Sequence, residues 1–293
     1  MMMATETFKQ NKPMQASDLL NAQLERMAAA RVHEYCPVHG CYTWSRLKNT
    51  SNPGCPKCAA EAEEKLRARA AFLSRMQRLE READAILGSY STPYDAKQTF
   101  ETFSVDDSNR NQKVAVMAAR KFAEGLMARL MSGNKEKSKN GLLLIGSFGT
   151  GKTHLANAIV NEVRKSGLAP VFLTAPTFFN FFRPGSSVSA NAATKALGSV
   201  PLLIVDELGR TTGSEFERTQ LQEVLDARSQ RGFPTVLISN LNMEGLMDFV
   251  GAAIASRVPM LFCPVVCAWG DYRKKKSLRG MTIDECFDVN VAD

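Results

Sequence analysis

The chain has no long apolar stretch and no recognisable leader. None of its apolar runs approaches the roughly 20 residues that a membrane-spanning helix needs, and its Met-rich start lacks an apolar core and a small-residue cleavage site. It also has no internal repeat. We therefore expect a cytoplasmic protein with no membrane partner, built as one core domain with extra material or as two domains.

Composition and charge narrow the class further. Hydrophobic residues make up 44% and charged residues 23% of the chain, as in ordinary globular proteins. The net charge of +7 is compatible with nucleic-acid binding but does not establish it. Seven cysteines in a cytoplasmic protein favour a metal site or buried thiols over disulfides.

A phosphate-binding loop is the clearest motif. Residues 146–153 read Gly-Ser-Phe-Gly-Thr-Gly-Lys-Thr, a complete G-x-x-x-x-G-K-T pattern between an apolar run and a stretch of helical spacing. The glycines let backbone N–H groups surround phosphate, and the helix that follows adds its positive dipole end. Lys152 is expected to reach the β- and γ-phosphates, and the Thr153 hydroxyl to bind Mg²⁺. The predicted contacts to a nucleoside triphosphate are made by Gly146, Ser147, Phe148, Gly149, Thr150, Gly151, Lys152, Thr153 and His154.

Polar side chains end two later apolar runs. Asp206 and Glu207 follow Leu-Leu-Ile-Val about fifty residues after the loop. Asp206 suits Mg²⁺ held through its water shell, and Glu207 can polarise the attacking water as a general base. Asn240 ends the next run, at the sheet edge where ligands gather. ATP hydrolysis is the prediction; acids that merely cap a strand, and an Asn that caps a loop, are the alternatives.

Apolar runs alternate with helical stretches in the second half of the chain. The runs lie at 141–145, 170–174, 201–206, 234–239 and 265–268, and a helix is expected at about 110–131. This alternation predicts an α/β fold with a parallel sheet covered by helices on both faces.

Two cysteine-bearing knuckles predict a zinc ribbon. Cys36-Pro-Val-His39 and Cys55-Pro-Lys-Cys58 each offer two ligands, and sixteen residues separate the pairs. The predicted zinc ligands are Cys36, His39, Cys55 and Cys58, although Cys41 could replace His39. A segment this small has little core, so the metal would supply most of its folding energy.

Helical patterns flank the ribbon. An amphipathic pattern runs from Ala16 to Arg31, with His33 expected at its end. Residues 59–87 lack Gly and Pro and stop at Gly88, which predicts a solvated connecting helix. We therefore expect an N-terminal docking region, a helical connector and an ATPase domain, at 1–60, 61–98 and 99–293.

Several motifs follow one another in order. They are Thr-Phe-Glu-Thr-Phe-Ser-Val from 99, Gly-x-x-Gly-Thr-Gly-Lys-Thr-His-Leu-Ala from 146, Leu-Leu-Ile-Val-Asp-Glu-Leu-Gly from 202, Leu-Asp-Ala-Arg from 225, Gly-Phe-Pro-Thr-Val-Leu-Ile-Ser-Asn-Leu from 232 and Ala-Ser-Arg-Val from 255. As a set they resemble the DnaC/DnaI-type bacterial helicase loaders, which are AAA+ ATPases with the IstB transposition ATPases as relatives. The resemblance covers roughly 99–275.

The resemblance implies further site residues. Asn240 would be the sensor-1 residue, and Arg257 the arginine finger that reaches the γ-phosphate held by a neighbouring copy. Self-association in an open helical arrangement would follow. Arg273 falls where the sensor-2 arginine is expected, although lysines follow it here instead of proline. Only about twenty residues come after Arg273, so no full helical lid is expected.

The resemblance also points to single-stranded DNA. Residues 177–183 carry four phenylalanines and Arg183, and a segment expected to be flexible leads to Lys195. The family uses this region to touch single-stranded DNA, so Arg183 and Lys195 are predicted to meet its phosphates. The phenylalanines either stack on bases or, as is more usual at this spacing, fill the core.

The implied function is that of an ATPase that helps to load a DnaB-type hexameric replicative helicase onto single-stranded DNA. ATP would favour assembly, and hydrolysis would release the loader. DnaI-like loaders dock through an N-terminal zinc-binding domain and DnaC-like loaders through a helix, and this chain shows both patterns. The alternatives are an IstB-like transposition helper, or a nucleotide-gated DNA-binding scaffold with negligible turnover. A small-molecule kinase is disfavoured because no lid or acceptor site is evident.

Overall fold

In the computed structural model, residues 30–46, 51–88, 94–132 and 139–272 are described, and the chain divides into two units, 1–70 and 71–293. The helix predicted at 16–31 lies outside the described residues except for its last two, which begin a strand instead. Arg273 also lies outside them.

The first unit holds a β-hairpin and the start of a long helix. Strands β1 (Ala30–Cys36) and β2 (Gly40–Arg46) pair antiparallel, and Gly40 turns the hairpin at φ 77°. A positive φ is a conformation that glycine adopts at little cost. The helix-end position predicted for His33 is wrong. His33 lies in β1, opposite Thr43, and Thr43 Oγ1 is 2.9 Å from its Nδ1.

A single helix, α2 (Pro56–Leu87), continues from this hairpin into the second unit. It confirms the helix predicted at 59–87, with Gly88 just beyond its end at φ 68°. Within the second unit its buried residues include Met76 and Glu80, and the Glu80 carboxylate accepts a hydrogen bond from the Ala169 N–H at 2.6 Å. Burial raises the pKa of Glu80.

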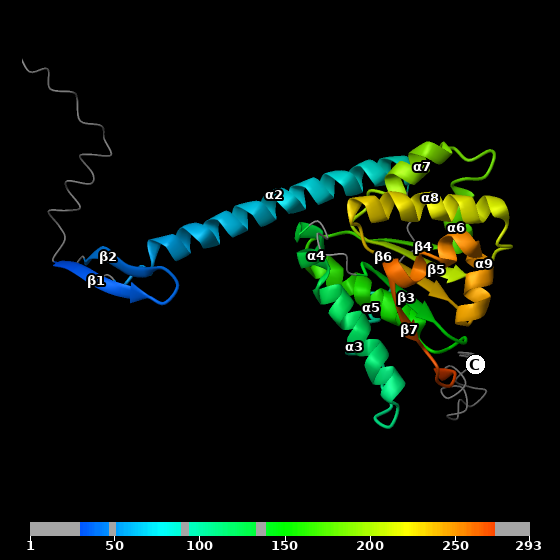
Figure 1. The fold of residues 1–293 in the computed structure, drawn as a ribbon, viewed down its shortest axis with the longest axis horizontal. Helices are drawn as coiled ribbons and strands as arrows, with labels where there is room; N and C mark the ends of the chain where they lie inside the picture. The colour runs from blue at the N-terminus through cyan, green and yellow to red at the C-terminus, as the bar shows by residue number, and fades with distance from the viewer. Residues whose placement is uncertain (1–29, 47–50, 89–93, 133–138, 273–293) are drawn as a thin grey trace, which may run out of the picture. The chain divides into compact units, whose positions relative to one another are not determined.

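The second unit is built on a five-stranded parallel sheet (Figure 1). Its strands are β3 (Gly141–Ile145), β4 (Val171–Thr174), β5 (Leu203–Leu208), β6 (Thr235–Ser239) and β7 (Phe262–Val266). Their spatial order is β4-β5-β6-β3-β7. The predicted α/β class is confirmed. Four strands lie within two residues of the predicted runs, and the last begins three residues before the predicted 265.

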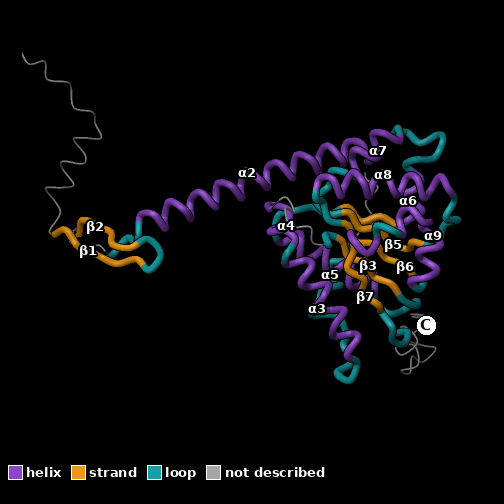
Figure 2. The backbone as a smooth tube through the Cα atoms, viewed as in Figure 1, coloured by secondary structure: helices purple, strands orange, loops and turns teal. Residues whose placement is uncertain are grey.

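Helices cover both faces of this sheet (Figure 2). One side carries α3 (Arg110–Glu124), α4 (Leu126–Ser132) and α5 (Lys152–Lys165), and the other carries α6 (Ala175–Asn180), α7 (Ala190–Leu197), α8 (Glu215–Arg231), α9 (Met243–Ala255) and α10 (Val258–Leu261). The single helix predicted at 110–131 is broken at Gly125. A Cβ at Gly125 would collide with the Arg129 side chain, which folds back to bond the Phe122 carbonyl at this break.

Each face of the sheet has its own hydrophobic core, and successive side chains along a strand point into opposite cores. Leu143 and Ile145 pack with α6 to α9, whereas Leu142 and Leu144 pack with α3 to α5. Because both faces are buried, the strands are apolar throughout, as in other sheets sandwiched by helices. Among the described residues, no helix is both long and apolar enough to span a membrane.

Candidate functional site

The predicted nucleotide-binding residues meet at the carboxyl edge of the sheet. Strand β3 runs into the phosphate loop, and its neighbour β6 runs into Asn240. Ile145 pairs with Ser239, and the Gly146 N–H donates to the Ser239 carbonyl at 3.3 Å. Asn240 therefore follows directly on the residue that touches the start of the phosphate loop, although the two motifs are almost a hundred residues apart.

Three glycines and one lysine determine the conformation of the phosphate loop. Gly146, Gly149 and Gly151 have φ values of 145°, 73° and 84°, a region that side-chain-bearing residues avoid. Lys152 is buried, and its Nζ donates to the carbonyls of Gly146 at 2.8 Å and Ser147 at 2.7 Å. A bound triphosphate would offer this ammonium stronger, charged acceptors in place of the two carbonyls.

Thr153 and Asp206 form the candidate magnesium site. The Thr153 hydroxyl donates to Asp206 Oδ2 at 2.8 Å, across more than fifty residues of sequence. Burial is the main cause that raises the pKa of Asp206, against hydrogen bonds from Thr153 and from the Glu207 N–H. A buried carboxylate beside a hydroxyl is an oxygen donor set that suits Mg²⁺, and a cation here would offset the cost of burying the charge.

Glu207 sits on a bulge in β5. Val205 pairs with Leu237 and Leu208 with Ser239, so three steps along β5 match two along β6. Glu207 takes up this extra residue at φ 64°, the one positive φ among described residues other than glycine. Bulges re-aim side chains, and strained backbone of this kind gathers at functional sites. Glu207 Oε1 accepts a hydrogen bond from Arg210 Nη1 at 2.6 Å.

Two segments that sequence reasoning did not assign to the site brace the phosphate loop. After β7, the Trp269 indole N–H donates to the Thr150 carbonyl at 2.9 Å, and the Tyr272 N–H donates to the Gly149 carbonyl at 3.0 Å. A Cβ at Gly149 would collide with the Asp271 carboxylate, so this glycine is also required by the close approach of that segment. No motif marked these contacts, because they join residues about 120 positions apart.

The second bracing segment precedes α3. His154, predicted to contact nucleotide, lies with its Nε2 2.9 Å from the Thr99 carbonyl, and the Phe103 ring packs edge-on against the imidazole. A Cβ at Gly151 would collide with Phe103. The segment that begins the predicted ATPase domain is thereby attached to the phosphate loop.

Arg257 is the N-cap residue just before α10 and has a partner within the chain. Its Nη1 lies 3.1 Å from Asp226 Oδ2 on α8, and the side chain remains 40% exposed. The structure thus links two of the sequence motifs, and leaves the guanidinium at the surface, where a second molecule can reach it.

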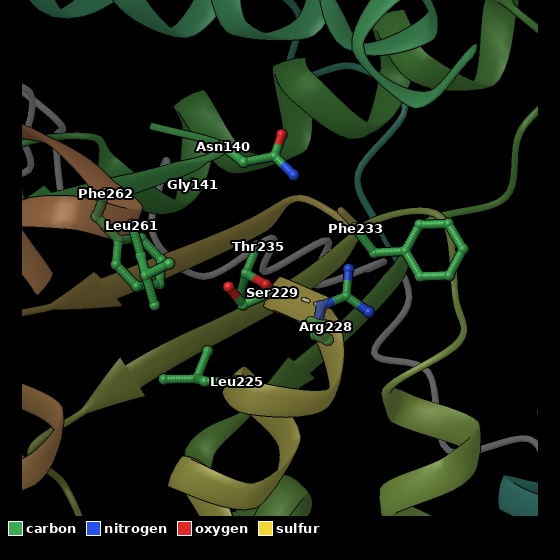
Figure 3. Close-up of a pocket in the computed structure, with 9 residues that line it drawn as sticks. All are labelled: Asn140, Gly141, Leu225, Arg228, Ser229, Phe233, Thr235, Leu261 and Phe262. Carbon is green, nitrogen blue, oxygen red and sulfur yellow. Dashed lines mark hydrogen bonds between the residues drawn. The ribbon is translucent and has the colours of Figure 1, made fainter. Parts of the chain in front are cut away.

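The rest of the Leu-Asp-Ala-Arg motif is structural. Arg228 is fully buried and donates to Thr235 Oγ1 at 2.8 Å, to the Leu197 and Val200 carbonyls at 2.6 and 3.0 Å, and to the Pro234 carbonyl. Burial, and then the charge of Arg231, lowers the pKa of Arg228 to about 9. Figure 3 shows Arg228 at a small hollow beside Thr235, at the opposite end of the strands from the phosphate loop.

The two predicted DNA-contacting side chains are exposed, but the phenylalanines beside them are buried. Arg183 and Lys195 are both exposed, and Arg183 Nη2 lies 3.9 Å from Glu217 Oε1. The segment before Lys195 was expected to be flexible, but part of it forms α7, capped by Ser189. The four phenylalanine rings are buried in the core, which excludes base stacking by them; they are Phe178, Phe179, Phe181 and Phe182.

The predicted zinc ligands come together in the first unit. One ligand atom from each of Cys36, His39, Cys55 and Cys58 lies within 4.8 Å of the others. Cys41 is exposed and outside this group, so the arrangement favours His39 as the fourth ligand. Three sulfurs and an imidazole are a typical structural zinc set.

The pKa values of two thiols in this cluster are shifted in opposite directions. Backbone N–H groups of His39 and Val38 lower the pKa of Cys36 to about 6. The pKa of Cys58 is raised to about 11, mainly by the hydrogen bond between Cys58 and Cys36. A divalent cation between them would favour the thiolate form of both, because metal ligation requires deprotonated sulfur.

Glu61 orients the histidine of this cluster. His39 Nδ1 lies 3.2 Å from Cys58 Sγ, and Nε2 lies 2.7 Å from Glu61 Oε1. Nδ1 is therefore the metal-facing nitrogen, and Glu61 fixes the tautomer through Nε2. On the same helix, Glu63 pairs instead with Arg67, at 2.6 Å.

Glu61→Gln is expected to weaken zinc binding about 10- to 100-fold, because the amide holds the imidazole less firmly than the carboxylate does. Competition with a coloured zinc chelator measures the affinity. Glu63→Gln is the matched control, since Glu63 lies on the same helix and pairs only with Arg67 among the described residues. Equal affinities for the two variants would contradict the role of Glu61.

Comparison with known proteins places these features among ATP-binding relatives. A family model described as IstB-like ATP binding protein matches residues 109–262, more than half of the chain.

The replicative helicase loader DnaC of Escherichia coli (strain K12) is 28% identical over 183 residues, which are 60% of this chain and 69% of that loader. The DnaC loader of Buchnera aphidicola subsp. Baizongia pistaciae (strain Bp) is 27% identical over 184 residues, 60% of this chain and 70% of the loader. A solved structure described as that of the DnaI is 24% identical, with a TM-score of 0.48, over 58% of this chain and 91% of that one. The resemblance drawn from the motifs is confirmed.

Proposed function

This chain belongs to the family of IstB-like ATP-binding proteins, and from that premise we propose that it is an ATP-hydrolysing loader of a DnaB-type replicative helicase. The observation that carries the ATPase part is the meeting of Lys152, Thr153, Asp206 and Asn240 at one edge of the sheet. The similarity to two replicative helicase loaders supports the choice of partner.

In this proposal, each residue at that edge of the sheet has its own role in ATP hydrolysis. Lys152 would leave the Gly146 and Ser147 carbonyls for the β- and γ-phosphates, and Thr153 and Asp206 would hold Mg²⁺. Mg²⁺, when bound, neutralises charge on the phosphate oxygens. Glu207 accepts the proton of the attacking water.

Two further residues complete the proposed machinery. Asn240 orients the γ-phosphate or the attacking water. Arg257 of a neighbouring copy neutralises the charge that develops as the γ-phosphoryl group leaves. Turnover therefore depends on self-association, and single-stranded DNA that organises the copies would stimulate it.

The N-terminal unit would provide the docking site for the helicase. Its zinc cluster supports a small rigid hairpin, and β1 and β2 leave Tyr35 and Val38 highly exposed near the cluster. Exposed apolar side chains of this size on a small module are suited to contact with another protein. In the ATPase unit, Arg183 and Lys195 would bind the phosphates of single-stranded DNA.

We expect the zinc-loaded protein, mixed with the replicative helicase of its own host and ATP, to form a stable complex with several copies per hexamer. Native mass spectrometry measures the stoichiometry. Cys55→Ser should lose the complex, because it removes a zinc ligand from the docking unit, whereas Cys41→Ser should keep it. Absence of any complex with the wild-type chain would contradict the loader function and favour the transposition helper, whose partner is target DNA or a transposase.

A further inference from the structure

Helix α9, which lies between Asn240 and Arg257 in the chain, is broken near its C-terminal end. Gly251 has φ 77° and ψ 165°, far from helical values, so the longer part of α9 ends there and its last turn starts in a new direction. The end of a helix leaves its last carbonyls without partners inside the helix. Two carbonyls just before the break, those of Asp248 and Phe249, therefore need donors from another element.

Arg218 on α8 supplies these donors. Its Nε donates to the Phe249 carbonyl and its Nη2 to the Asp248 carbonyl, both at 2.8 Å. The stem of the side chain passes close to Gly251, since a Cβ at that glycine would lie 3.0 Å from Arg218 Cδ. The planar guanidinium, with its donors in a fixed fork, is suited to holding two carbonyls at once.

Helix α8 is a firm support for this contact. At its start, Ser214 Oγ accepts the Glu217 N–H, and the Glu217 carboxylate accepts the Gly213 N–H at 2.9 Å. Toward its other end, the buried Arg228 donates to carbonyls that precede β5 and β6. Because both ends of α8 are attached to their surroundings, a side chain that reaches from α8 to the break restricts the movement of the break.

The turn after the break carries the proposed arginine finger. The N–H groups of Ser256 and Arg257 both donate to carbonyls that follow the break, at 3.1 and 2.9 Å. The direction of this turn at Gly251 therefore determines where the Arg257 backbone lies. The ion pair with Asp226 is a weaker constraint, because it lies at the surface and has to open before the guanidinium can reach a neighbouring molecule.

We propose that Arg218 is a positioning residue, which sets the reach of Arg257 toward the nucleotide of a neighbouring copy by holding the break in α9. The inference rests on the proposed function, because it requires Arg257 to act on another copy. Displacement of a catalytic group by about 1 Å can cost roughly 100-fold in rate. Loss of the two bonds at the break therefore lowers turnover, whereas ATP binding depends on the loop around Lys152 and stays unchanged.

Arg218→Ala is expected to lower DNA-stimulated turnover about 10- to 100-fold with an unchanged Kd for ATP. Phosphate release measures the turnover, and titration with a fluorescent ATP analogue measures the affinity. Arg218→Lys, which keeps the charge but loses the fork, should fall between wild type and Arg218→Ala. Arg231→Ala is the matched control and should keep wild-type turnover, because Arg231 is an exposed arginine at the other end of the same helix.

Mixtures of variants distinguish positioning of the finger from general damage to the fold. Arg218→Ala retains its own Lys152 and Glu207 and lacks only a correctly placed finger. In an equal mixture with Glu207→Gln, turnover should therefore exceed the average of the two separate samples several-fold. An equal mixture with Arg257→Ala should show no such gain, because neither variant supplies a working finger to its neighbour.

The outcomes separate this inference from the proposed function. Wild-type turnover in Arg218→Ala, a gain in both mixtures, or a gain in neither would overturn the role of Arg218 alone, provided that Arg257→Ala and Glu207→Gln recover activity when mixed. A wild-type chain that hydrolyses no ATP, with or without DNA, would overturn the proposed function and the inference with it. Failure of Arg257→Ala and Glu207→Gln to recover together would overturn the finger, and again the inference with it.

Discussion

Arg257→Ala is expected to keep its affinity for ATP and to lose about 10³- to 10⁵-fold of its DNA-stimulated turnover. The reason is that the guanidinium acts on the γ-phosphate held by a neighbouring copy, whereas ATP binding depends on the loop around Lys152 of the same chain. Phosphate release measures turnover, and titration with a fluorescent ATP analogue measures affinity. Lys152→Ala should instead lose binding itself.

The ion pair of Arg257 with Asp226 supplies the control. Asp226→Ala breaks the same contact, at 3.1 Å, but leaves the guanidinium in place, so it should keep turnover. If both variants lose activity equally, or if Arg257→Ala keeps full turnover, Arg257 is a structural residue of α10 and not a finger.

Mixing two inactive variants tests action between copies. Neither Arg257→Ala nor Glu207→Gln should hydrolyse ATP at an appreciable rate alone. In an equal mixture, about a quarter of the head-to-tail contacts pair an intact Glu207 with an intact Arg257 from the neighbour. Turnover should therefore recover to a substantial fraction of wild type, and failure to recover would exclude a finger supplied in trans.

Cys55→Ser is expected to unfold the hairpin of the first unit while the ATPase unit still binds ATP. Structural zinc contributes an apparent free energy of about 10–16 kcal/mol to small domains of this kind, far more than a two-stranded hairpin can supply by itself. Zinc content by mass spectrometry should fall from one per chain to none, and amide hydrogen exchange across β1 and β2 should become fast.

Cys41→Ser is the matched control for this prediction. Cys41 lies in β2 but is exposed and outside the cluster, so its variant should retain one zinc and slow exchange. Loss of zinc in Cys41→Ser with retention in His39→Ala would show that Cys41 is the fourth ligand and that the arrangement of the cluster is different.

Sequence reasoning succeeded where chemistry depends on neighbouring positions. The phosphate loop, the Asp206–Glu207 pair and the two knuckles place their groups through fixed local spacing, so pattern alone located residues that the structure brings together, while their roles stay predictions. The strand at β7 was located late because Pro264 interrupts its apolar run. Pro264 is tolerated because, within the described part of the chain, β7 is an edge strand paired only with β3, and there a missing N–H need not break the ladder.

Contacts between distant residues could not be anticipated in the same way. Trp269 on Thr150, His154 on Thr99 and Arg257 on Asp226 each join elements that only the folded sheet brings together. The burial of the phenylalanines around 178–182, by contrast, is the outcome that the sequence favoured, and the structure excludes the alternative of base stacking.

The positive φ of Glu207 has an evolutionary consequence. A glutamate in this conformation costs about 1–3 kcal/mol relative to an unstrained residue, and glycine would relieve it. Selection for heat tolerance alone would therefore tend to replace Glu207, and every lineage that keeps the residue is selected for its chemistry against its effect on stability. Stabilised variants recovered from a screen for folding, without a requirement for ATP turnover, should carry substitutions at this position more often than chance predicts.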